Sequence, residues 1–423
     1  MTALPQAVVA KARALAAAAA DPVSAFIYDL PALRRHVQWM KSCLPPGVEL
    51  YYAIKANSEA PILEALAPLV DGFEISSGGE IARVRQSSST QNFIFSGPGK
   101  LDYDLEQAMQ QGVEMIHVES MDEIRRLNAV AARMGRRQAV LLRINPTLPP
   151  QLATKLSMAG APTPFGIDED QLPGAVALVE QCAHLELQGF HVHAMSHQLD
   201  VARHIQLLDW YLDKWPQWKG LARNGAPVRC LNAGGGMGVN YLQPAQFDWP
   251  QLCRHLAQRL AADPQAPRLR FEPGRFVSAF CGYYLMQVLD LKHSHGKNFA
   301  VCRGGTHQFR LPAAQAHDHP VLHLPTATSA ATNAAATAAA AADAAWTIVG
   351  QLCTPKDVLA RDVSLPGLAI GDLLVLPLAG AYGFNISHAD FLCHPRPVQV
   401  FLDQAESETN PQWSETHAAH ACP

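Results

Sequence analysis

The sequence predicts an α/β protein in which a (β/α)8 TIM-type barrel is followed by a mostly β C-terminal domain. Most of the expected barrel strands are followed by a stretch with helical spacing, such as 121–134 or 202–215. After Pro273 the pattern changes, and strands follow one another with few helices between them. The eight expected barrel strands begin near Glu49, Gly72, Asn92, Met115, Ala139, Leu187, Val228 and Arg268.

The expected domains follow in chain order. Residues 1–24 contain an alanine-rich stretch with a basic start, which we expect to be a helix because alanine is too weakly apolar for the core of a signal peptide. The barrel is expected over 25–275, although its opening segment 25–30 can instead pair with the β domain. The β domain is expected over 276–403, with an alanine- and threonine-rich insertion at 325–345 that is a surface segment or a short helix. Residues 404–423 form a tail.

Composition limits the classes of function. The chain has 423 residues, of which 48% are hydrophobic, so it can bury a large core and form two domains. A net charge of -4 gives no excess of positive charge for binding nucleic acid. Nine cysteines without paired spacing favour free thiols, and no zinc-binding pattern is present. No apolar run approaches the roughly 20 residues that cross a bilayer, so we expect no membrane partner. Together with the net charge and the cysteine pattern, this predicts a cytoplasmic protein with no metal or nucleic-acid partner.

Lys55 ends the first barrel strand. An apolar run, residues 51–54, leads into this amine, and a helix start with Ser58 as its cap follows at once. The amine therefore lies at the mouth of a strand-to-helix loop, where α/β folds place their chemistry. If its surroundings lower the pKa of Lys55, the neutral amine can condense with a carbonyl to form a Schiff base. An ordinary lysine at a strand end is the alternative on this segment alone.

The last two barrel strands end in residues suited to an anion. After the seventh strand, the glycines of segment 232–238 allow backbone amides to close around phosphate, although a tight turn is the simpler interpretation. The eighth strand ends in Glu272-Pro273-Gly274-Arg275. The arginine suits a phosphate and the glutamate a ring nitrogen, whereas a salt bridge at a turn is the alternative. Barrels often bind phosphate after these two strands, which favours the functional interpretation.

Several segments, taken in order, resemble motifs of the fold type III pyridoxal 5'-phosphate (PLP) decarboxylases. This alanine-racemase-like family includes the ornithine and diaminopimelate decarboxylases, and the resemblance covers residues 25–403. The segments that carry it are 52–57 (Tyr-Ala-Ile-Lys-Ala-Asn), 74–80 (Glu-Ile-Ser-Ser-Gly-Gly-Glu), 191–196 (His-Val-His-Ala-Met-Ser), 234–236 (Gly-Gly-Gly), 272–275 (Glu-Pro-Gly-Arg), 350–353 (Gly-Gln-Leu-Cys) and 380–383 (Gly-Ala-Tyr-Gly).

The resemblance implies a role for each matching residue. Lys55 would hold PLP, Glu272 would keep the pyridine nitrogen protonated, and His193 would stack on the cofactor, although a lone histidine is equally a core residue. Arg143 would lie near the lysine and cofactor, and Glu74 near the cofactor. The resemblance implies that the phosphate is bound by Ser196, Gly234, Gly235, Gly236, Arg275 and Tyr382.

The resemblance also implies a head-to-tail homodimer. Cys353 of the second subunit would supply a proton to the carbanion left at Cα when CO2 departs, so the active sites would be shared between subunits. A racemase on this scaffold would need a base on each face, typically a lysine and a tyrosine. Cys353 in its Gly-x-x-Cys setting points to decarboxylation.

The substrate is expected to differ from a free diamino acid. Relatives that act on diamines place an acidic residue after the cysteine, whereas here Thr354 follows, and a neutral hydroxyl cannot balance a buried ammonium. Asp357 remains in the family position, and Arg310 resembles the arginine that meets a substrate carboxylate. Histidines together with Arg310, Lys356 and Arg361 would suit a polyanion.

These traits most resemble the branch in carboxylate siderophore biosynthesis, which decarboxylates an amino acid already linked to citrate, such as citryl-diaminopropionate. Decarboxylation of an aminoacyl group on a carrier protein is a second interpretation. Diaminopimelate or another diamino acid is a third, which Thr354 disfavours. A non-catalytic PLP-binding homologue is the fourth, and it conflicts with the presence of Lys55 and Cys353.

Overall fold

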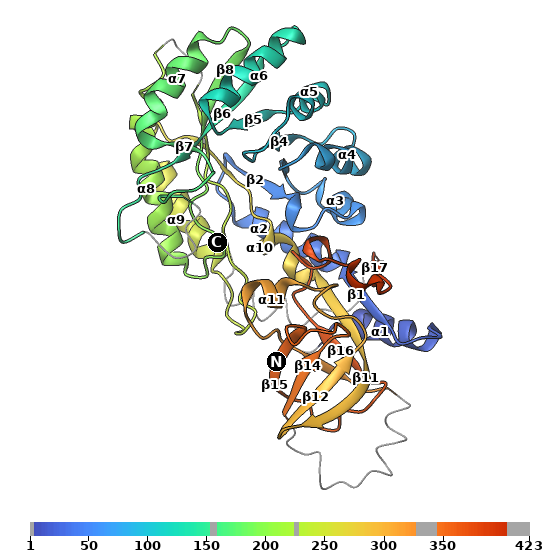
Figure 1. Ribbon diagram of the computed structural model, residues 1–423. Helices are drawn as coiled ribbons and strands as arrows, with labels where there is room; N and C mark the ends of the chain where they lie inside the picture. The colour runs from blue at the N-terminus through green and yellow to red at the C-terminus, as the bar shows by residue number, and fades with distance from the viewer. Residues whose placement is uncertain (1–3, 153–158, 224–227, 327–344, 404–423) are drawn as a thin grey trace. The chain divides into compact units, whose positions relative to one another are not determined.

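The computed structural model describes residues 4–152, 159–223, 228–326 and 345–403. These residues form two compact units (Figure 1). The barrel unit contains residues 34–239 and 246–277. The described residues of the β unit are 4–33, 240–245, 278–326 and 345–403.

The barrel unit is built on a closed parallel sheet. Its strands lie in the order β5-β4-β3-β2-β10-β9-β8-β6, and pairing of β5 with β6 closes the circle. A two-residue strand, β7 (Ile167–Asp168), extends the sheet beside β6. The predicted eight-stranded barrel is therefore confirmed. The barrel strands are β2 (Val48–Ala53), β3 (Gly72–Ile75), β4 (Phe93–Phe95), β5 (Met115–Val118), β6 (Gln138–Asn145), β8 (Leu185–His191), β9 (Cys230–Asn232) and β10 (Arg268–Phe271).

Helices follow the strands and bury one apolar face each. In α6 (Met121–Arg133), the side chain of Ser120 caps the first turn by accepting a hydrogen bond from the backbone N–H of Glu123. Ile124, Leu127 and Val130 of this helix are buried, as the helical period requires. The other helices after α2 (Leu30–Cys43) are α3 (Ala60–Leu66), α4 (Gly78–Ser87), α5 (Asp102–Gln110), α7 (Leu172–Gln181), α8 (Val201–Lys219), α9 (Trp249–Ala261) and the short α10 (Arg275–Ser278).

The cap predicted at Ser58 is wrong by one residue. Lys55 lies in a single 3-10 turn, η1 (Ile54–Ala56), and α3 then begins with Glu59 as its N-cap residue. The side chain of Asn57 accepts a hydrogen bond from the backbone N–H of Glu59 at 3.1 Å, so this buried amide supports the turn. Asparagine competes well for such local contacts with the backbone.

The β unit is a second, mostly antiparallel sheet with the order β13-β16-β11-β12-β14-β15. Strand β1 pairs antiparallel with β11 and parallel with β17, so the opening segment 25–30 belongs to this sheet. Helix α1 (Gln6–Ala18) buries Val8 and Ala12 against Ile27 and Leu285. The strands are β1 (Ser24–Asp29), β11 (Gly282–Ser294), β12 (Lys297–Cys302), β13 (Leu322–Leu324), β14 (Ala345–Val349), β15 (Val358–Ser364), β16 (Leu373–Leu376) and β17 (Val398–Leu402).

Some expectations need correction or lie outside the described residues. The β domain is expected from residue 276, but its first strand after that point begins only at Gly282, because α10 and the 3-10 turn η3 (Ala279–Cys281) precede it. Most of the 325–345 tract and the whole 404–423 tail are outside the described residues. Free thiols are found at Cys182, Cys230, Cys253, Cys281, Cys302, Cys353 and Cys393, whereas Cys43 is disulfide-bonded. Among the described helices, none has the length and apolar character to cross a membrane.

Candidate active site

Lys55 forms an ion pair with a buried carboxylate. Its Nζ lies 2.9 Å from Oε2 of Glu74, which is on the neighbouring strand β3 and completely buried, while about half of the lysine side chain is exposed. The other oxygen of Glu74 accepts hydrogen bonds from Ser76 Oγ at 3.1 Å and from Ser96 Oγ. Burial by itself raises the pKa of Glu74, but the charge of Lys55 and these hydrogen bonds outweigh it and leave that pKa below its ordinary value.

A second buried carboxyl group has the opposite electrostatic character. Glu272 follows β10, and its Oε1 accepts a hydrogen bond from Asn232 Nδ2 at 2.5 Å. Burial raises the pKa of Glu272 to about 8, and the negative charge of Glu74 adds to that rise. Two carboxyl groups whose surroundings push their pKa values apart are typical of sites that divide acid and base roles.

The glycine loop, residues 234–236, packs closely against neighbouring backbone. Gly234 and Gly236 have φ values of +68° and +95°, which favour glycine. A Cβ on Gly235 would lie 2.4 Å from the backbone oxygen of Glu272, and one on Gly236 equally close to that of Met195. These positions therefore require glycine, and successive glycines leave backbone amides without side chains beside them, as in phosphate-binding loops.

His193 and Ser196 lie beside this loop. The backbone N–H of Gly235 donates to His193 Nδ1 at 3.2 Å, so the neutral ring carries its proton on Nε2. Burial, followed by the charges of Arg143 and Lys55, lowers the pKa of His193 to about 3. The backbone N of Ser196 lies 3.8 Å from the position of a Cβ on Gly236. The structure thus brings these two predicted residues to the glycine loop.

Arg275 begins α10, three residues after Glu272. The preceding Gly274 packs against the lysine turn, because a Cβ on it would lie 2.9 Å from Cβ of Ala56 and 3.1 Å from the backbone oxygen of Ala53. The end of the eighth barrel strand and the turn that carries Lys55 are therefore in direct contact.

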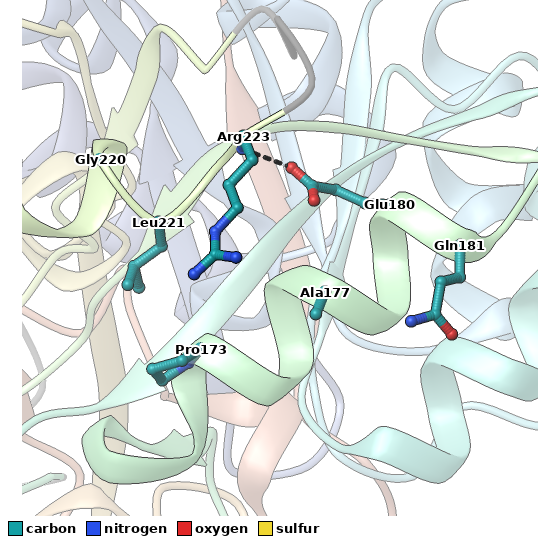
Figure 2. Close-up of a pocket in the computed structure, with 7 residues that line it drawn as sticks. All are labelled: Pro173, Ala177, Glu180, Gln181, Gly220, Leu221 and Arg223. Carbon is teal, nitrogen blue, oxygen red and sulfur yellow. Dashed lines mark hydrogen bonds between the residues drawn. The ribbon is translucent and has the colours of Figure 1, made fainter.

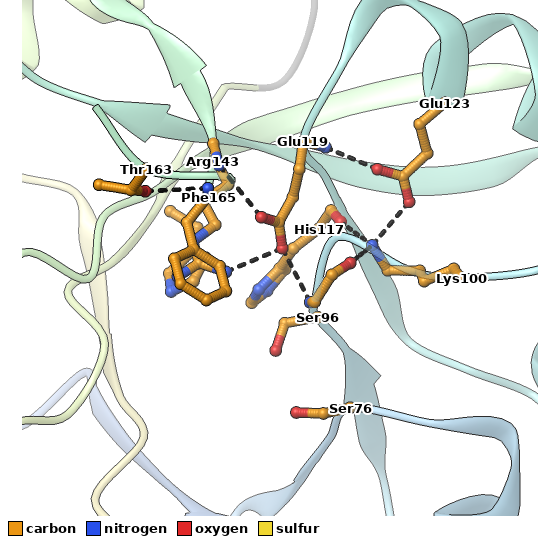
Figure 3. Close-up of polar contacts among 12 residues, drawn as sticks. Ser76, Ser96, Lys100, His117, Glu119, Glu123, Arg143, Thr163 and Phe165 are labelled. Atoms are coloured by element: carbon orange, nitrogen blue, oxygen red, sulfur yellow. Dashed lines mark hydrogen bonds and ion pairs between the residues drawn. The ribbon is translucent and has the colours of Figure 1, made fainter. Parts of the chain in front are cut away.

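Arg143 takes part in a buried network at the carboxyl ends of β5 and β6 (Figure 3). Its guanidinium lies 2.8 Å from Glu119 Oε1 and over the ring of Phe165. The same glutamate accepts hydrogen bonds from the backbone N–H groups of Gly97 and Gly166 at 2.8 and 3.1 Å. This arrangement fixes the orientation of Arg143, since its carboxylate partner is itself held by two loops.

The remaining predicted residues belong to the β unit. Cys353 is exposed, and Thr354 Oγ1 accepts a hydrogen bond from the backbone N–H of Lys356 at 3.3 Å. Arg310 is exposed at the start of α11 (Leu311–Gln315), and its backbone N–H donates to Ser387 Oγ. Tyr382 is partly buried, with a positive φ of 52°.

Asp357 organises the loop that carries Cys353. It is buried, and its Oδ1 accepts hydrogen bonds from the backbone N–H and Oγ1 of Thr306 at 2.6 and 2.7 Å. Its Oδ2 accepts from the backbone N–H of Leu352 at 2.8 Å. Gly305 and Gly350 meet beside it so closely that a Cβ on Gly350 would lie 2.3 Å from Cα of Gly305. The carboxylate is therefore committed to holding two loops together.

Several site residues were not predicted from the sequence. His117 is fully buried on β5, and Lys100 donates at 2.6–2.7 Å to the backbone oxygens of Gly97 and His117 and to Glu123 Oε1. Two signals in the sequence could have indicated these residues. His117 is a histidine within an apolar strand, and Glu119 directly follows the end of that strand. Asn232 was noted only as part of the glycine segment, and its contact with Glu272 joins strands distant in sequence.

The barrel unit also has a surface pocket that contains none of the candidate site residues described above (Figure 2). It lies beside α7 and the end of α8, and in it the backbone N–H of Arg223 donates to Glu180 Oε1 at 2.7 Å. None of the predicted site residues lines this pocket, whose residues are Pro173, Ala177, Glu180, Gln181, Gly220, Leu221 and Arg223.

The fold and these residues define a class of enzyme: a barrel that presents a lysine, two buried carboxyl groups and a glycine loop at the carboxyl ends of its strands. Residues 30–279 match the pyridoxal-binding domain of the pyridoxal-dependent decarboxylases. The chain belongs to this family, and it is a PLP-dependent decarboxylase that acts on an amino-acid-derived substrate.

Known proteins resemble the chain over most of its length. It is 41% identical over 393 residues to 2-[(L-alanin-3-ylcarbamoyl)methyl]-2-hydroxybutanedioate decarboxylase of Staphylococcus aureus, which covers 92% of this chain and 97% of that one. It is 30% identical over 390 residues to L-glutamyl-[BtrI acyl-carrier protein] decarboxylase of Niallia circulans, over 89% and 87% of the two chains. The crystal structure of diaminopimelate decarboxylase from Helicobacter pylori, an I148L mutant complexed with L-lysine, superposes with a TM-score of 0.79 at 24% identity, over 95% and 98% of the two chains. This last likeness concerns the fold.

Proposed function

We propose that this decarboxylase removes the Cα carboxylate of a diamino acid that is joined to citrate through an amide, a reaction of siderophore biosynthesis. The observation that carries the proposal is the 41% identity, over 92% of the chain, to the Staphylococcus aureus enzyme. The name of that enzyme describes a citrate with one terminal carboxyl group joined to the side-chain nitrogen of 2,3-diaminopropionate. Thr354 supports the same substrate, because it offers no negative charge to a distal ammonium.

The residues of the barrel unit fit a phosphorylated pyridine aldehyde. When bound, PLP supplies an aldehyde for covalent attachment and a ring that accepts the electrons released as CO2 leaves. We assign Lys55 to the covalent attachment, and Glu272 to the ring nitrogen. His193, neutral and oriented by Gly235, would lie against the ring face. We assign the phosphate to Ser196, Gly234, Gly235, Gly236, Arg275 and Tyr382, which offer hydroxyls, backbone amides and a guanidinium.

Glu74 and Arg143 would prepare the site without taking part in bond breaking. Glu74 would hold the amine of Lys55 in place until the attachment forms, since the two groups are 2.9 Å apart. Arg143, held by Glu119, adds a fixed positive charge that keeps His193 neutral.

We assign proton delivery at Cα to Cys353 of the partner subunit in a head-to-tail homodimer. The exposed position of Cys353 on its own unit supports a role in which it completes a site elsewhere. Asp357 would act by fixing the Cys353 loop, because both of its oxygens are occupied by Thr306 and Leu352. Thr354, Lys356 and Arg310 would face the citrate part of the substrate, where two cations and a hydroxyl suit carboxylates.

A carrier-bound aminoacyl group is the second candidate substrate. The 30% identity to the Niallia circulans enzyme favours it, since the name of that enzyme describes a glutamyl group on an acyl-carrier protein. This candidate requires recognition of a protein surface, whereas the citrate-linked candidate requires a small anionic pocket.

A substrate panel separates these candidates. The purified PLP-loaded enzyme is mixed with citryl-diaminopropionate, free 2,3-diaminopropionate, diaminopimelate and a glutamyl-carrier protein, and CO2 release is followed. We expect kcat/KM for the citrate-linked substrate to exceed that for each other compound at least about 100-fold. Equal or faster release from the glutamyl-carrier protein or from diaminopimelate would contradict the proposal.

A further inference from the structure

Two histidines and a glutamate meet inside the barrel at the ends of β5, β8 and β10. His191 Nε2 lies 3.5 Å from Glu272 Oε2, and His117 Nδ1 lies 3.9 Å from Glu272 Oε1. The two imidazole rings lie side by side, with centroids 4.3 Å apart. All three side chains are buried. We call His117 and His191 the histidine pair.

The histidine pair has unused hydrogen-bonding groups. None of its four ring nitrogens has a hydrogen-bond partner within the residues that the structure describes. Buried polar groups are normally paired, and an unpaired one in a native structure needs an explanation. The carboxyl group of Glu272 is close enough to become the missing hydrogen-bond partner. A movement of about 0.5 Å would bring His191 into hydrogen-bonding range of it.

The histidine pair is electrically neutral. Burial is the largest cause that lowers the pKa of each histidine well below its ordinary value, and nearby positive charges add to it. A neutral imidazole has one N–H and one lone pair, so it can donate to an ionised carboxylate. The charged and titratable groups that act on the pair and on Glu272 are Lys55 (η1), Glu74 (β3), Lys100 (after β4), Arg143 (β6), His193 (after β8) and Arg270 (β10).

A bound metal ion fits these surroundings less well. The ligand atoms of His117, His191 and Glu272 do lie within 4.8 Å of one another, a spacing that a divalent ion could use. The same positive charges that keep the histidines neutral would repel such an ion. Asn232 already donates a hydrogen bond to the carboxyl group of Glu272. This contact suits a carboxyl group that binds an organic ligand.

We propose that His117 and His191 are positioning residues that close onto Glu272 when the cofactor binds, and then hold its carboxylate ionised and aimed at the ring nitrogen. This inference rests on the role proposed above for Glu272. As the structure stands, burial and the charge of Glu74 raise the pKa of Glu272 to about 8 and favour the neutral carboxylic acid, and hydrogen bonds from the two histidine N–H groups would lower that pKa. A neutral Glu272 would be a poorer partner for a protonated ring nitrogen.

The test compares two probes that differ at one ring atom. PLP and its analogue with CH in place of the ring nitrogen are titrated into the apoprotein, and the dissociation constants are read from absorbance. We expect wild-type protein to prefer PLP, and we expect His191→Leu and His117→Leu each to reduce that preference at least fivefold. His191→Gln and His117→Asn place an amide near the original Nε2 and Nδ1, so they should restore most of it.

Two further variants make the result decisive. Glu272→Gln should abolish the preference for PLP. His204→Leu removes another buried histidine with an unpartnered Nδ1, located on α8, and should leave the preference unchanged. Leucine variants that keep the wild-type preference while Glu272→Gln loses it would overturn the role of the histidine pair.

Two other outcomes identify different errors. A wild-type protein that binds both probes equally would refute the assignment of Glu272, and the inference would fall with it. One equivalent of zinc in the purified apoprotein, lost from the leucine variants, would overturn the inference in favour of a metal site. If a leucine variant fails to fold, His191→Phe and His117→Phe take its place, because they keep a buried ring without an N–H donor and should reduce the preference to the same extent.

Discussion

The two units present their candidate site residues in different ways. In the barrel unit, the pairs Lys55–Glu74 and Arg143–Glu119 are ion pairs of 2.9 and 2.8 Å formed within that unit. In the β unit, Cys353 and Arg310 are exposed on loops. The barrel therefore fixes these charges by itself, whereas the exposed side chains of the β unit suit the role we propose for them in completing a site. We expect substitutions in the barrel to change cofactor chemistry, and substitutions in the β unit to change protonation and substrate choice.

The largest effect is expected in the barrel. Lys55→Ala removes the amine assigned to cofactor attachment, so kcat should fall at least about 1,000-fold and the visible absorbance near ~420 nm should be lost. Absorbance spectra and CO2 release measure the two effects. Lys41→Ala is the matched control, since Lys41 forms a surface ion pair with Asp71 and should retain both properties. Full turnover by Lys55→Ala would refute the assignment of this lysine.

The next effect tests the exposed group of the β unit. Cys353→Ala should lower kcat about 100- to 1,000-fold, because it removes the thiol to which we assign proton delivery, while the cofactor absorbance remains. Cys182→Ala is the control for loss of a partly exposed thiol. A Cys353→Ala enzyme that turns over at the wild-type rate would exclude the cysteine from proton delivery.

Mixed subunits test whether the site is shared. If Lys55 and Cys353 of one site come from different chains, a random mixture of Lys55→Ala and Cys353→Ala subunits should regain about a quarter of wild-type activity, since half of the dimers then contain one intact site of two. Analytical ultracentrifugation gives the oligomeric state, and CO2 release gives the recovery. Mixtures as inactive as either parent, despite confirmed subunit exchange, would contradict a shared site.

A smaller change is expected in substrate choice. Thr354→Asp adds a negative charge where we expect the citrate part of the substrate, so kcat/KM for the citrate-linked substrate should fall about 10- to 100-fold. Thr354→Asn, which has similar size and no charge, should lose far less. Steady-state kinetics on both variants provide the comparison. An unchanged kcat/KM for Thr354→Asp would place the citrate part elsewhere.

The smallest effect concerns the stability of the apoprotein. The pKa of Glu272 is about 8 in the folded protein and has an ordinary value of 4.5, so the folded state binds one more proton between these values. Stability therefore falls as pH rises from about 4.5 to about 8, and it levels off above that. Glu272→Gln should remove this slope. The free energy of unfolding of the variant, taken relative to that of wild type, should therefore be more than about 1 kcal/mol higher at pH 9 than at pH 5.

Urea denaturation of the apoprotein measures this slope. Glu106→Gln on the exposed face of α5 is the control, and its pH dependence should match that of wild type. Equal slopes for wild type and Glu272→Gln would show that Glu272 is ionised in the folded apoprotein.

The sequence predicted the strand ends well because parallel barrel strands leave strong local patterns. The apolar run that ends at Lys55 and the run that ends at Glu272 are both visible in the chain. The histidine pair was harder to predict, since His117 and His191 meet only after β5 and β8 have curved around the barrel. The residues next to a histidine in the sequence do not indicate whether its side chain faces the inside of the barrel and meets a second histidine there.

The β unit was predicted less completely for a related reason. Strands β13 and β15 contain His323 and Arg361 within short runs, so their apolar pattern is weak, and their pairing partners stabilise them. The part played by Asp357 was also missed. Its two oxygens join segments near Thr306 and Leu352, and such a contact depends on the closed loops rather than on neighbouring residues in the sequence.

The pairing of β2 with β10 joins the first and last strands of the barrel, and the backbone N–H of Ala53 donates to the oxygen of Pro273 at 3.3 Å. During synthesis on the ribosome, the lysine emerges more than 200 residues before its neighbours on β10. The nascent chain therefore has no means of assembling the catalytic centre until the final strand has left the exit tunnel. A prematurely terminated polypeptide that lacks β10 would carry Lys55 without the strand that pairs with β2 beside it.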